Sequence, residues 1–372
     1  MINKINANLP TPSLILDYKI FLKNINKMSI FSRNYNIKTR PHAKTHKTPE
    51  IAKIQIKNGS VGVCVANIYE AEVMAKNNIP GILLTSPIIN EYDKNRLNNI
   101  LKISKNFCIV IDSKQAIEYL SEICFKHNLK CRVLIDIDIM SDGKKKIGRT
   151  GARNLVDVLK LCQLVNDSQN LLYEGICAYA GDIQHINDYL SRLKQAKKRY
   201  DYLSHIIDNL IKNNLKPKIV SGGGTGSHII DTKSGLFTEI QPGSYIFSDV
   251  EYDKVQLNIS GSNNYKASLF IASTVISIIN KNNFIVNSGL KAFSTDSSYL
   301  PKPIINELKF HFKGDEHGMI TTSKKFKKTI KLGDTILIQP SHCDPTVNLY
   351  DKIRVYDKKI IKTWDISARG YF

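Results

Sequence analysis

The sequence predicts an α/β protein in which a (β/α)₈, TIM-like barrel is followed by a C-terminal all-β domain. Eight short apolar runs alternate with helical patterns over about 230 residues, as in such barrels. Near residue 250 the pattern changes to closely spaced strand-like runs, with short loops and no long helical pattern. A chain of 372 residues is long enough for both domains.

The barrel prediction depends on the order of the apolar runs. The last helical pattern repeats Leu, Tyr and Ile at three- and four-residue spacing, which indicates a buried helix face. An open, doubly wound sheet is the alternative, because it has the same alternation of strands and helices. We expect strands at residues 37–44, 61–66, 81–86, 107–112, 131–138, 172–179, 218–222 and 239–247, and helices at 68–76, 114–127, 155–165 and 190–212.

The second domain is predicted from alternating runs separated by loops that carry Gly, Asn or Asp. We place the barrel at residues 18–250 and the β domain at 251–372, together with an N-terminal strand from residues 1–17. Within that strand, residues 13–17 are β-like and are candidates to pair with the later sheet. The strand-like runs are 266–278, 283–288, 307–312, 317–322, 335–340, 352–356 and 360–366.

The composition is ordinary for a soluble globular protein, with 42% hydrophobic and 23% charged residues. No apolar run approaches the roughly 20 residues that span a bilayer, and residues 1–10 lack the apolar centre of a secretory signal. The seven cysteines form no C-x-x-C pair, which favours reduced thiols and a cytoplasmic protein.

The net charge of +20 comes mostly from lysines spread along a sequence that is also rich in Asn and Ile. This combination indicates a compositional bias of the genome rather than a binding surface, so we expect neither a nucleic-acid nor a membrane partner. The clusters at residues 144–146 and 324–328 could be anion patches, although solvated loops are the simpler interpretation.

Residues 40–47, R-P-H-A-K-T-H-K, are the first segment that indicates chemistry. They lie at the predicted C-terminal end of the first strand, where barrels of this type build their active sites. A lysine held among other cations has a depressed pKa and can act as an amine nucleophile. A solvated basic loop is the alternative.

Two glycine-containing segments lie directly after the seventh strand, at residues 221–227 (S-G-G-G-T-G-S), and at the eighth strand, at residues 242–245 (P-G-S-Y). Phosphate sites in these barrels lie at this position, and glycine lets backbone N–H groups approach a phosphate closely. The first segment is not a Walker loop, because no Gly-Lys-Ser/Thr follows. A pair of tight turns is the alternative.

Two further segments place histidines near the predicted site. His185 follows the sixth strand and is either a general base or a structural histidine. On a strand, His342 and Asp344 would point to the same side and could offer a nitrogen and an oxygen to one cation. Such ligands suit Mn²⁺, Mg²⁺, Zn²⁺ or Co²⁺, although a lone H-x-D is more often a hydrogen-bonded pair.

Together with P-S-H-C-D-P-T-V-N-L-Y-D at residues 340–351, the segments at 40–47 and 221–227 resemble the D-threonine aldolase and D-serine dehydratase family. These are pyridoxal-phosphate enzymes of fold type III, with the alanine racemase-like fold. The likeness runs from about Thr11 to Gly370. It implies a barrel plus a β domain, a homodimer and a small D-amino-acid substrate.

By position, the resemblance implies that Lys44 carries the cofactor and that His185 is the aldolase base. His342 and Asp344 match the metal pair, with Mn²⁺ preferred over Mg²⁺, Co²⁺ or Zn²⁺. Dehydratases of the family typically have H-x-C here and aldolases have H-x-D, so Asp344 favours an aldolase. The other cofactor-binding positions implied are Arg149, Tyr179, Thr225, Gly226, Gly243, Ser244 and Tyr245.

The chain departs from the family pattern between Asp138 and Arg149, where residues 139–148 replace a shorter glycine-containing turn. Residues 315–318, D-E-H-G, also resemble a family motif; a second metal, a subunit contact and a polar turn are the alternatives. The implied reaction is metal-activated cleavage of D-threonine, or of another D-β-hydroxy-α-amino acid, to glycine and an aldehyde. The alternatives are a D-serine or D-3-hydroxyaspartate dehydratase, or an amino-acid racemase. A non-catalytic carrier of pyridoxal phosphate is disfavoured, because such barrels lack the β domain.

Overall fold

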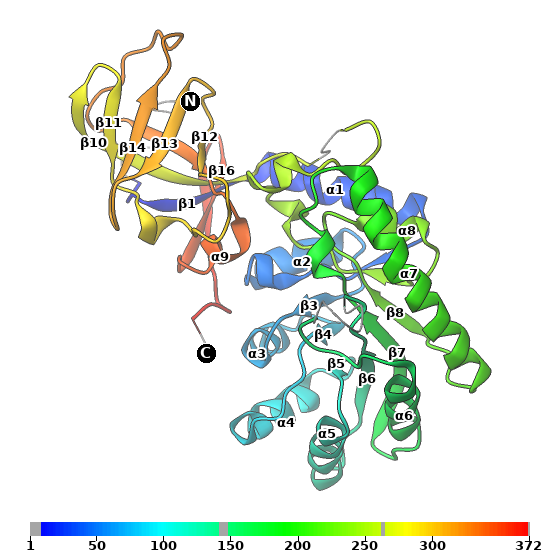
Figure 1. Cartoon of the computed structure of the whole chain (residues 1–372). Coiled ribbons are helices and arrows are strands. Elements are labelled where there is room, and N and C mark those ends of the chain that lie inside the picture. The colour runs from blue at the N-terminus through cyan, green and yellow to red at the C-terminus, as the bar shows by residue number, and fades with distance from the viewer. Residues whose placement is uncertain (1–8, 141–147, 262–264, 371–372) are drawn as a thin grey trace.

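A computed structural model describes residues 9–140, 148–261 and 265–370 of the chain (Figure 1). These residues form a barrel of parallel strands with surrounding helices and, beside it, a domain built mainly of antiparallel strands. The predicted fold class is therefore confirmed. The division near residue 250 stays a proposal.

Eight short and mostly buried parallel strands form the barrel. They are β2 (Lys38–Thr39), β3 (Val63–Val65), β4 (Ile82–Leu84), β5 (Cys108–Ile111), β6 (Cys131–Asp136), β7 (Leu171–Ala178), β8 (Ile219–Gly222) and β9 (Glu239–Ile240). Their order is β2-β9-β8-β7-β6-β5-β4-β3, so each strand from β3 to β9 lies beside the next in sequence. The two edge strands approach each other where His42 pairs with Cys64, whose N–H donates to the carbonyl of Pro41 at 2.8 Å. The sheet thus closes, which excludes the open, doubly wound alternative.

All eight predicted strands are present, and so are the four predicted helices. Each of these helices begins after a residue whose side chain accepts a backbone N–H of the first turn, which satisfies a donor that the helix leaves unpaired. The prediction gave no bounds for the helix before β2 and missed three others. The predicted helices are α3 (Ile68–Lys76), α5 (Lys114–Lys126), α6 (Leu155–Asn166) and α7 (Tyr189–Lys212); the others are α1 (Tyr18–Asn34), α2 (Pro49–Lys57), α4 (Lys94–Ile103) and α8 (His228–Lys233).

The β domain contains all seven strand-like runs that the sequence indicates. They are β10 (Leu269–Asn280), β11 (Asn283–Val286), β13 (Leu308–Phe312), β14 (Gly318–Thr322), β15 (Thr335–Gln339), β16 (Lys352–Asp357) and β17 (Lys359–Asp365). The expected N-terminal strand, β1 (Ser13–Asp17), lies between β10 and β16, antiparallel to the first and parallel to the second. The two-residue strand β12 (Lys302–Pro303) and the short helix α9 (Cys343–Val347) were not predicted.

Several predicted strands are shorter than expected, and the two largest differences lie at the site. The first barrel strand ends at Thr39 and is followed by the 3-10 helix η1 (Ala43–Thr45), and the eighth ends at Ile240 and is followed by η4 (Ser244–Ile246). A proline follows each strand, at positions 41 and 242, and cannot donate to a ladder.

The seven cysteines all lie in described ranges, and each is buried and unpaired. None of the helices in these ranges combines the length and apolar character that a membrane span requires. The segments 1–8, 141–147, 262–264 and 371–372 lie outside the described residues, and with them the lysine cluster at 144–146 and most of the long 139–148 loop.

Candidate active site

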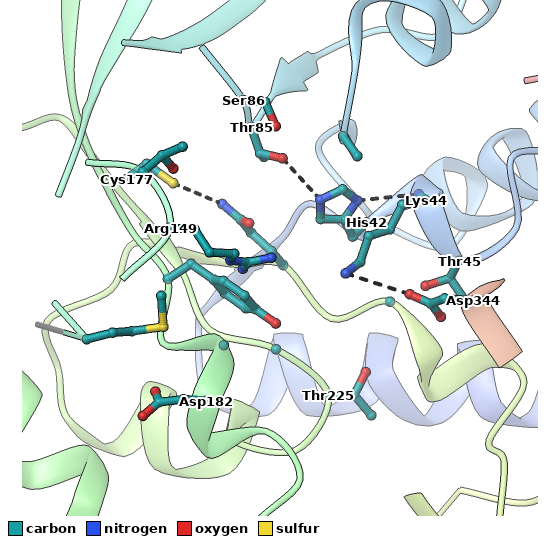
Figure 2. Close-up of a pocket in the computed structure, with 18 of the residues that line it drawn as sticks. His42, Lys44, Thr45, Thr85, Ser86, Arg149, Cys177, Asp182, Thr225 and Asp344 are labelled. Carbon is teal, nitrogen blue, oxygen red and sulfur yellow. Dashed lines mark hydrogen bonds and ion pairs between the residues drawn. The ribbon is translucent and has the colours of Figure 1, made fainter. Parts of the chain in front are cut away.

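A cavity of about 580 Å³ opens at the C-terminal ends of the barrel strands, where α9 of the β domain faces the barrel. Figure 2 shows side chains from both domains pointing into it, with Lys44 opposite Asp344. Most of the residues singled out from the sequence line this cavity. They are Lys44, Arg149, Tyr179, His185, Thr225, Gly243, Ser244, His342 and Asp344.

Lys44 lies in η1 and not on a strand, because its N–H donates to Nδ1 of the capping His42 at 3.3 Å. The ammonium of Lys44 points into the cavity, 3.8 Å from Oδ2 of Asp344. Burial alone would lower the pKa of Lys44, but the Asp344 carboxylate raises it overall. The expectation of a depressed pKa is therefore wrong, because a carboxylate from the β domain, which no local sequence pattern indicates, faces this lysine.

Lys47 does not line the cavity, because its side chain pairs with Glu70. Its ammonium forms a buried ion pair with Glu70, whose other carboxylate oxygen accepts the N–H of Ala66 at 2.7 Å. Its carbonyl accepts the N–H of Ala368 at 3.0 Å, which ties this turn to the C-terminal segment. Lys44 and Lys47 thus differ in role because of a 3-10 helix and a buried ion pair.

Replacing Lys47 by Met should destabilise the protein, while the amine of Lys44 remains in the cavity. The change leaves the fully buried Glu70 without its cation, and loss of one partner of such a pair costs about 3–5 kcal/mol. Urea unfolding measures this loss. The double variant Lys47→Met/Glu70→Gln is the control and should recover a substantial part of it; equal losses in both would contradict a role for the ion pair.

The loop after β8 and the turn before η4 form a cradle at one end of the cavity. Oγ1 of Thr225 accepts the N–H of Tyr245 at 3.1 Å, which holds the two segments together. In the described part of the chain, the N–H groups of Thr225 and Ser244 have no hydrogen-bond partner. A Cβ on Gly243 would collide with the hydroxyl of Thr45, so the close approach requires glycine. This arrangement fits the phosphate of pyridoxal phosphate.

Gly226 and Tyr245, which the resemblance also assigns to cofactor binding, do not line the cavity. The N–H of Gly226 donates to Oε1 of Gln184 at 3.0 Å, so it is already used within the protein. The hydroxyl of Tyr245 accepts from the side chain of Gln55 at 3.2 Å, and its ring is buried in the core. Both residues shape the cradle and neither lines the cavity.

Removal of the Thr225 hydroxyl should weaken binding of pyridoxal phosphate. A hydrogen bond to a charged group contributes about 1.5–3 kcal/mol, so Thr225→Ala should raise the dissociation constant of the cofactor about 10- to 100-fold. Thr225→Ser keeps the hydroxyl and should bind nearly as the parent does. Titration of the apoprotein, followed by tyrosine and tryptophan fluorescence, measures both; unaltered affinity in Thr225→Ala would place the phosphate elsewhere.

Arg149 reaches the cavity despite the long segment before it. The guanidinium carbon lies 5.5 Å from the ring centre of Tyr179, a cation–π arrangement. The Asp138 carboxylate accepts the N–H groups of Met140 at 2.9 Å and Gly148 at 3.0 Å, so it ties down both described ends of the loop.

His42 is a site residue to which the sequence analysis assigned no role. Its Nε2 lies 3.1 Å from Oγ1 of Thr85, which in turn donates to the carbonyl of Val65 at 3.0 Å. Burial and the neighbouring Lys44 hold the pKa of His42 well below its usual range, so the ring is neutral. The segment at 40–47 contains both His42 and His46, and their spacing alone does not show that His42 is the one that lines the cavity.

His342 and Asp344 meet at the cavity through a helix start. His342 is the residue before α9 and Asp344 lies in its first turn, so the strand argument for this pair is wrong. Ser244 donates its hydroxyl to Oδ1 of Asp344 at 3.1 Å, which links the pair to the cradle. Nδ1 of His342 lies 2.6 Å from Oδ2 of Asp296.

The pair can supply one nitrogen and one oxygen to a divalent cation. Among the described residues, no group of three His, Cys, Asp or Glu side chains is arranged to hold a metal. A cation at this pair would thus take its remaining ligands from water or substrate, as catalytic sites do. Burial would raise the pKa of Asp344, but Lys44 and His342 lower it overall, so the Asp344 carboxylate is ionised.

His185 lies beside this pair, at the end of the segment that follows β7. Its ring centre is 6.0 Å from that of His342, and its Nδ1 is 3.6 Å from Oε2 of Glu251. Burial lowers the pKa of His185, although Glu251 partly opposes this. A neutral imidazole can accept a proton, so the placement fits a general base. No motif in the sequence pointed to Glu251.

Residues 315–318 do not line the cavity. They lie at the turn between β13 and β14, where Glu316 forms an exposed ion pair with Lys291 at 2.7 Å. The polar turn is the alternative that this geometry favours.

Comparison with known proteins agrees with the fold. Residues 16–250 match the family of the alanine racemase N-terminal domain, and residues 268–356 match a serine dehydratase domain family. A 3-hydroxy-D-aspartate aldolase of Paracoccus denitrificans (strain Pd 1222) is 31% identical over 98% of this chain and 93% of its own. A D-threonine aldolase of Arthrobacter sp. is 30% identical over 98% and 94%. The crystal structure of D-threonine aldolase from Filomicrobium marinum has a TM-score of 0.89, at 30% identity, over 98% of this chain and 96% of that one.

A closed parallel barrel, an added β domain and a lysine at the mouth of the barrel define an enzyme of the alanine racemase type. Within that class, the chain belongs to the pyridoxal-phosphate-dependent family of the D-threonine aldolases and D-serine dehydratases. The resemblance inferred from the three sequence motifs is thereby confirmed.

Proposed function

We propose that this enzyme is a metal-activated aldolase that cleaves D-threonine, or another D-β-hydroxy-α-amino acid, to glycine and an aldehyde. The observation that carries the proposal is the placement of Asp344. This carboxylate and His342 lie across one cavity from Lys44 and beside His185, so a cation-binding pair, an amine and a base share one space. The names of the aldolase relatives support the same reaction class.

Lys44 is the residue that would hold pyridoxal phosphate, with the cradle of Thr225, Gly243 and Ser244 around its phosphate. When bound, this cofactor supplies an electron sink for a carbanion at the substrate Cα. Arg149 and Tyr179 form the wall beside Lys44 and restrict how a ring can lie there.

His342 and Asp344 would hold the divalent cation, with Mn²⁺ preferred over Mg²⁺, Co²⁺ or Zn²⁺. A cation there supplies a Lewis acid for the substrate β-hydroxyl. Nε2 of His185 accepts the hydroxyl proton, directly or through a water, because Nδ1 faces Glu251. Loss of this proton lets the C–O bond become a carbonyl as the Cα–Cβ bond breaks, and the aldehyde leaves.

A D-serine or D-3-hydroxyaspartate dehydratase is the second candidate, because the β domain matches a serine dehydratase family. The same pair would then help the hydroxyl leave from Cβ. Asp344 favours the aldolase, as dehydratases of the family typically have cysteine at this position. The racemase, the homodimer and the cytoplasmic location remain predictions.

The test is to treat the purified protein with EDTA, restore pyridoxal phosphate, and assay D- and L-forms of threonine, serine and 3-hydroxyaspartate with and without Mn²⁺. The proposal predicts glycine and an aldehyde from a D-β-hydroxy-amino acid, with Mn²⁺ required. Products that are 2-oxoacids alone would favour the dehydratase. Full activity after EDTA without added metal would contradict metal activation.

A further inference from the structure

Asp296 lies in the loop before β12, outside every motif that the sequence indicates, and its carboxylate contacts His342 through Nδ1 at 2.6 Å. We propose that Asp296 is a positioning residue that holds His342 in the tautomer and orientation in which Nε2 can bind the activating cation. The inference rests on the proposed function, since it requires a cation at His342 and Asp344.

Asp296 determines which tautomer of His342 is present. A neutral imidazole carries one N–H, and the nitrogen without it keeps a lone pair for a metal. The Asp296 carboxylate can only accept, so it fixes that N–H on Nδ1 of His342. Nε2 is then the nitrogen with the lone pair. A carboxylate on the second nitrogen also makes an imidazole a better metal ligand, and loss of such a partner typically weakens metal binding 10- to 100-fold.

The loop that carries Asp296 also holds the backbone of His342 in place. Ser294 donates its hydroxyl to Oδ1 of Asp296 at 2.6 Å, and its N–H to Oγ1 of Thr346 at 3.1 Å. Thr346 in turn donates its hydroxyl to the carbonyl of His342 at 2.7 Å. The ring and the main chain of His342 are thus both fixed by one loop.

The exposure of Asp296 to solvent separates this role from a stabilising one. The side chain of Asp296 is 52% exposed, and ion pairs that face solvent contribute little to stability. An exposed carboxylate contributes little to the free energy of unfolding. It can still orient a metal ligand, because orientation requires the hydrogen bond and not burial. Removal of Asp296 should therefore affect the cation far more than the fold.

The experiment measures Mn²⁺ affinity of the pyridoxal-phosphate-loaded protein, from the EPR signal of unbound Mn²⁺, so that it does not depend on turnover. The variants are Asp296→Ala, His342→Ala and the double variant. Asp365→Asn is the matched control, because Asp365 is an exposed carboxylate that pairs with Lys352 and not with a histidine. We expect Asp296→Ala to raise the Mn²⁺ dissociation constant about 10- to 100-fold and Asp365→Asn to leave it unchanged.

The double variant tests whether Asp296 affects Mn²⁺ binding through His342 or independently of it. If Asp296 acts through His342, then Asp296→Ala costs no further affinity once His342 is absent. Asp296→Ala affinity equal to the parent's, or a further loss in the double variant, would overturn the inference alone. Unchanged affinity in His342→Ala would overturn the proposed metal site as well. Thermal unfolding of all variants should agree within a few degrees.

Discussion

Lys44→Ala is expected to lose essentially all activity together with the visible absorbance band that borohydride removes from the parent protein. The amine of Lys44 is the one that the structure places in the cavity, opposite Asp344 and beside the cradle. Loss of a covalent catalyst costs many orders of magnitude, so kcat/KM should fall by more than about 10⁴-fold. Absorbance spectra and steady-state kinetics measure the two effects.

The control for Lys44→Ala is the charge-neutral double variant Lys47→Met/Glu70→Gln, because it removes the other lysine of the same segment without leaving a buried charge. It should keep the absorbance band. Disappearance of the band in this control, with its retention in Lys44→Ala, would show that the lysine assignment is reversed.

Asp344→Ala is expected to keep the cofactor band but to lose most activity and the response to Mn²⁺. The variant removes one of the two protein ligands that the cavity offers to a cation. A Lewis acid contributes several kcal/mol to such a reaction, so kcat should fall by about 10³-fold. The fold should persist, because the side chain of Asp344 lies at the cavity wall and not in the apolar core. Unchanged activity that still requires added cation would place the metal site elsewhere.

Asp344→Cys is the sharper companion variant, because it recreates the H-x-C pattern of the dehydratases. A thiolate is a softer ligand than a carboxylate and favours Zn²⁺, so Mn²⁺ should activate this variant less than it activates the parent. If the residue at position 344 also influences whether the Cα–Cβ or the Cβ–O bond breaks, some 2-oxoacid should form from D-serine or D-threonine. Retention of full Mn²⁺ activation would show that Asp344 is not a ligand. Asp365→Asn is the control, since it removes an exposed carboxylate that pairs with Lys352 and should leave Mn²⁺ activation unchanged.

The sequence was sufficient for the barrel strands because most of them lie in short apolar runs between turn residues. The amphipathic α7 was equally clear. Helix α4 was missed because its apolar positions, Leu97, Ile100 and Leu101, stand among polar residues and cover only a narrow stripe. The N-terminal strand β1 was anticipated from its β-like residues, but its parallel pairing with β16 follows only from the complete sheet.

The site was predicted in its parts but not in its geometry. The sequence motifs identified Lys44, His342 and Asp344, yet both segments were assigned to strands, whereas short helices begin at both places. The contact of Lys44 with Asp344 joins positions 300 residues apart, so no local pattern encodes it. Asp296 and Glu251 were missed for a related reason: each contributes a single carboxylate from a loop without a motif.

The fate of the substrate Cα carbon distinguishes an aldolase from a dehydratase and from a racemase. D-Threonine labelled with ¹³C at Cα is incubated with the protein, pyridoxal phosphate and Mn²⁺, and the label is observed by NMR. We expect the label to appear in glycine, with an equal amount of acetaldehyde, and Asp344→Ala to slow this severely. Label in 2-oxobutanoate, or label that stays in threonine while its configuration at Cα is lost, would show that the protein is not an aldolase.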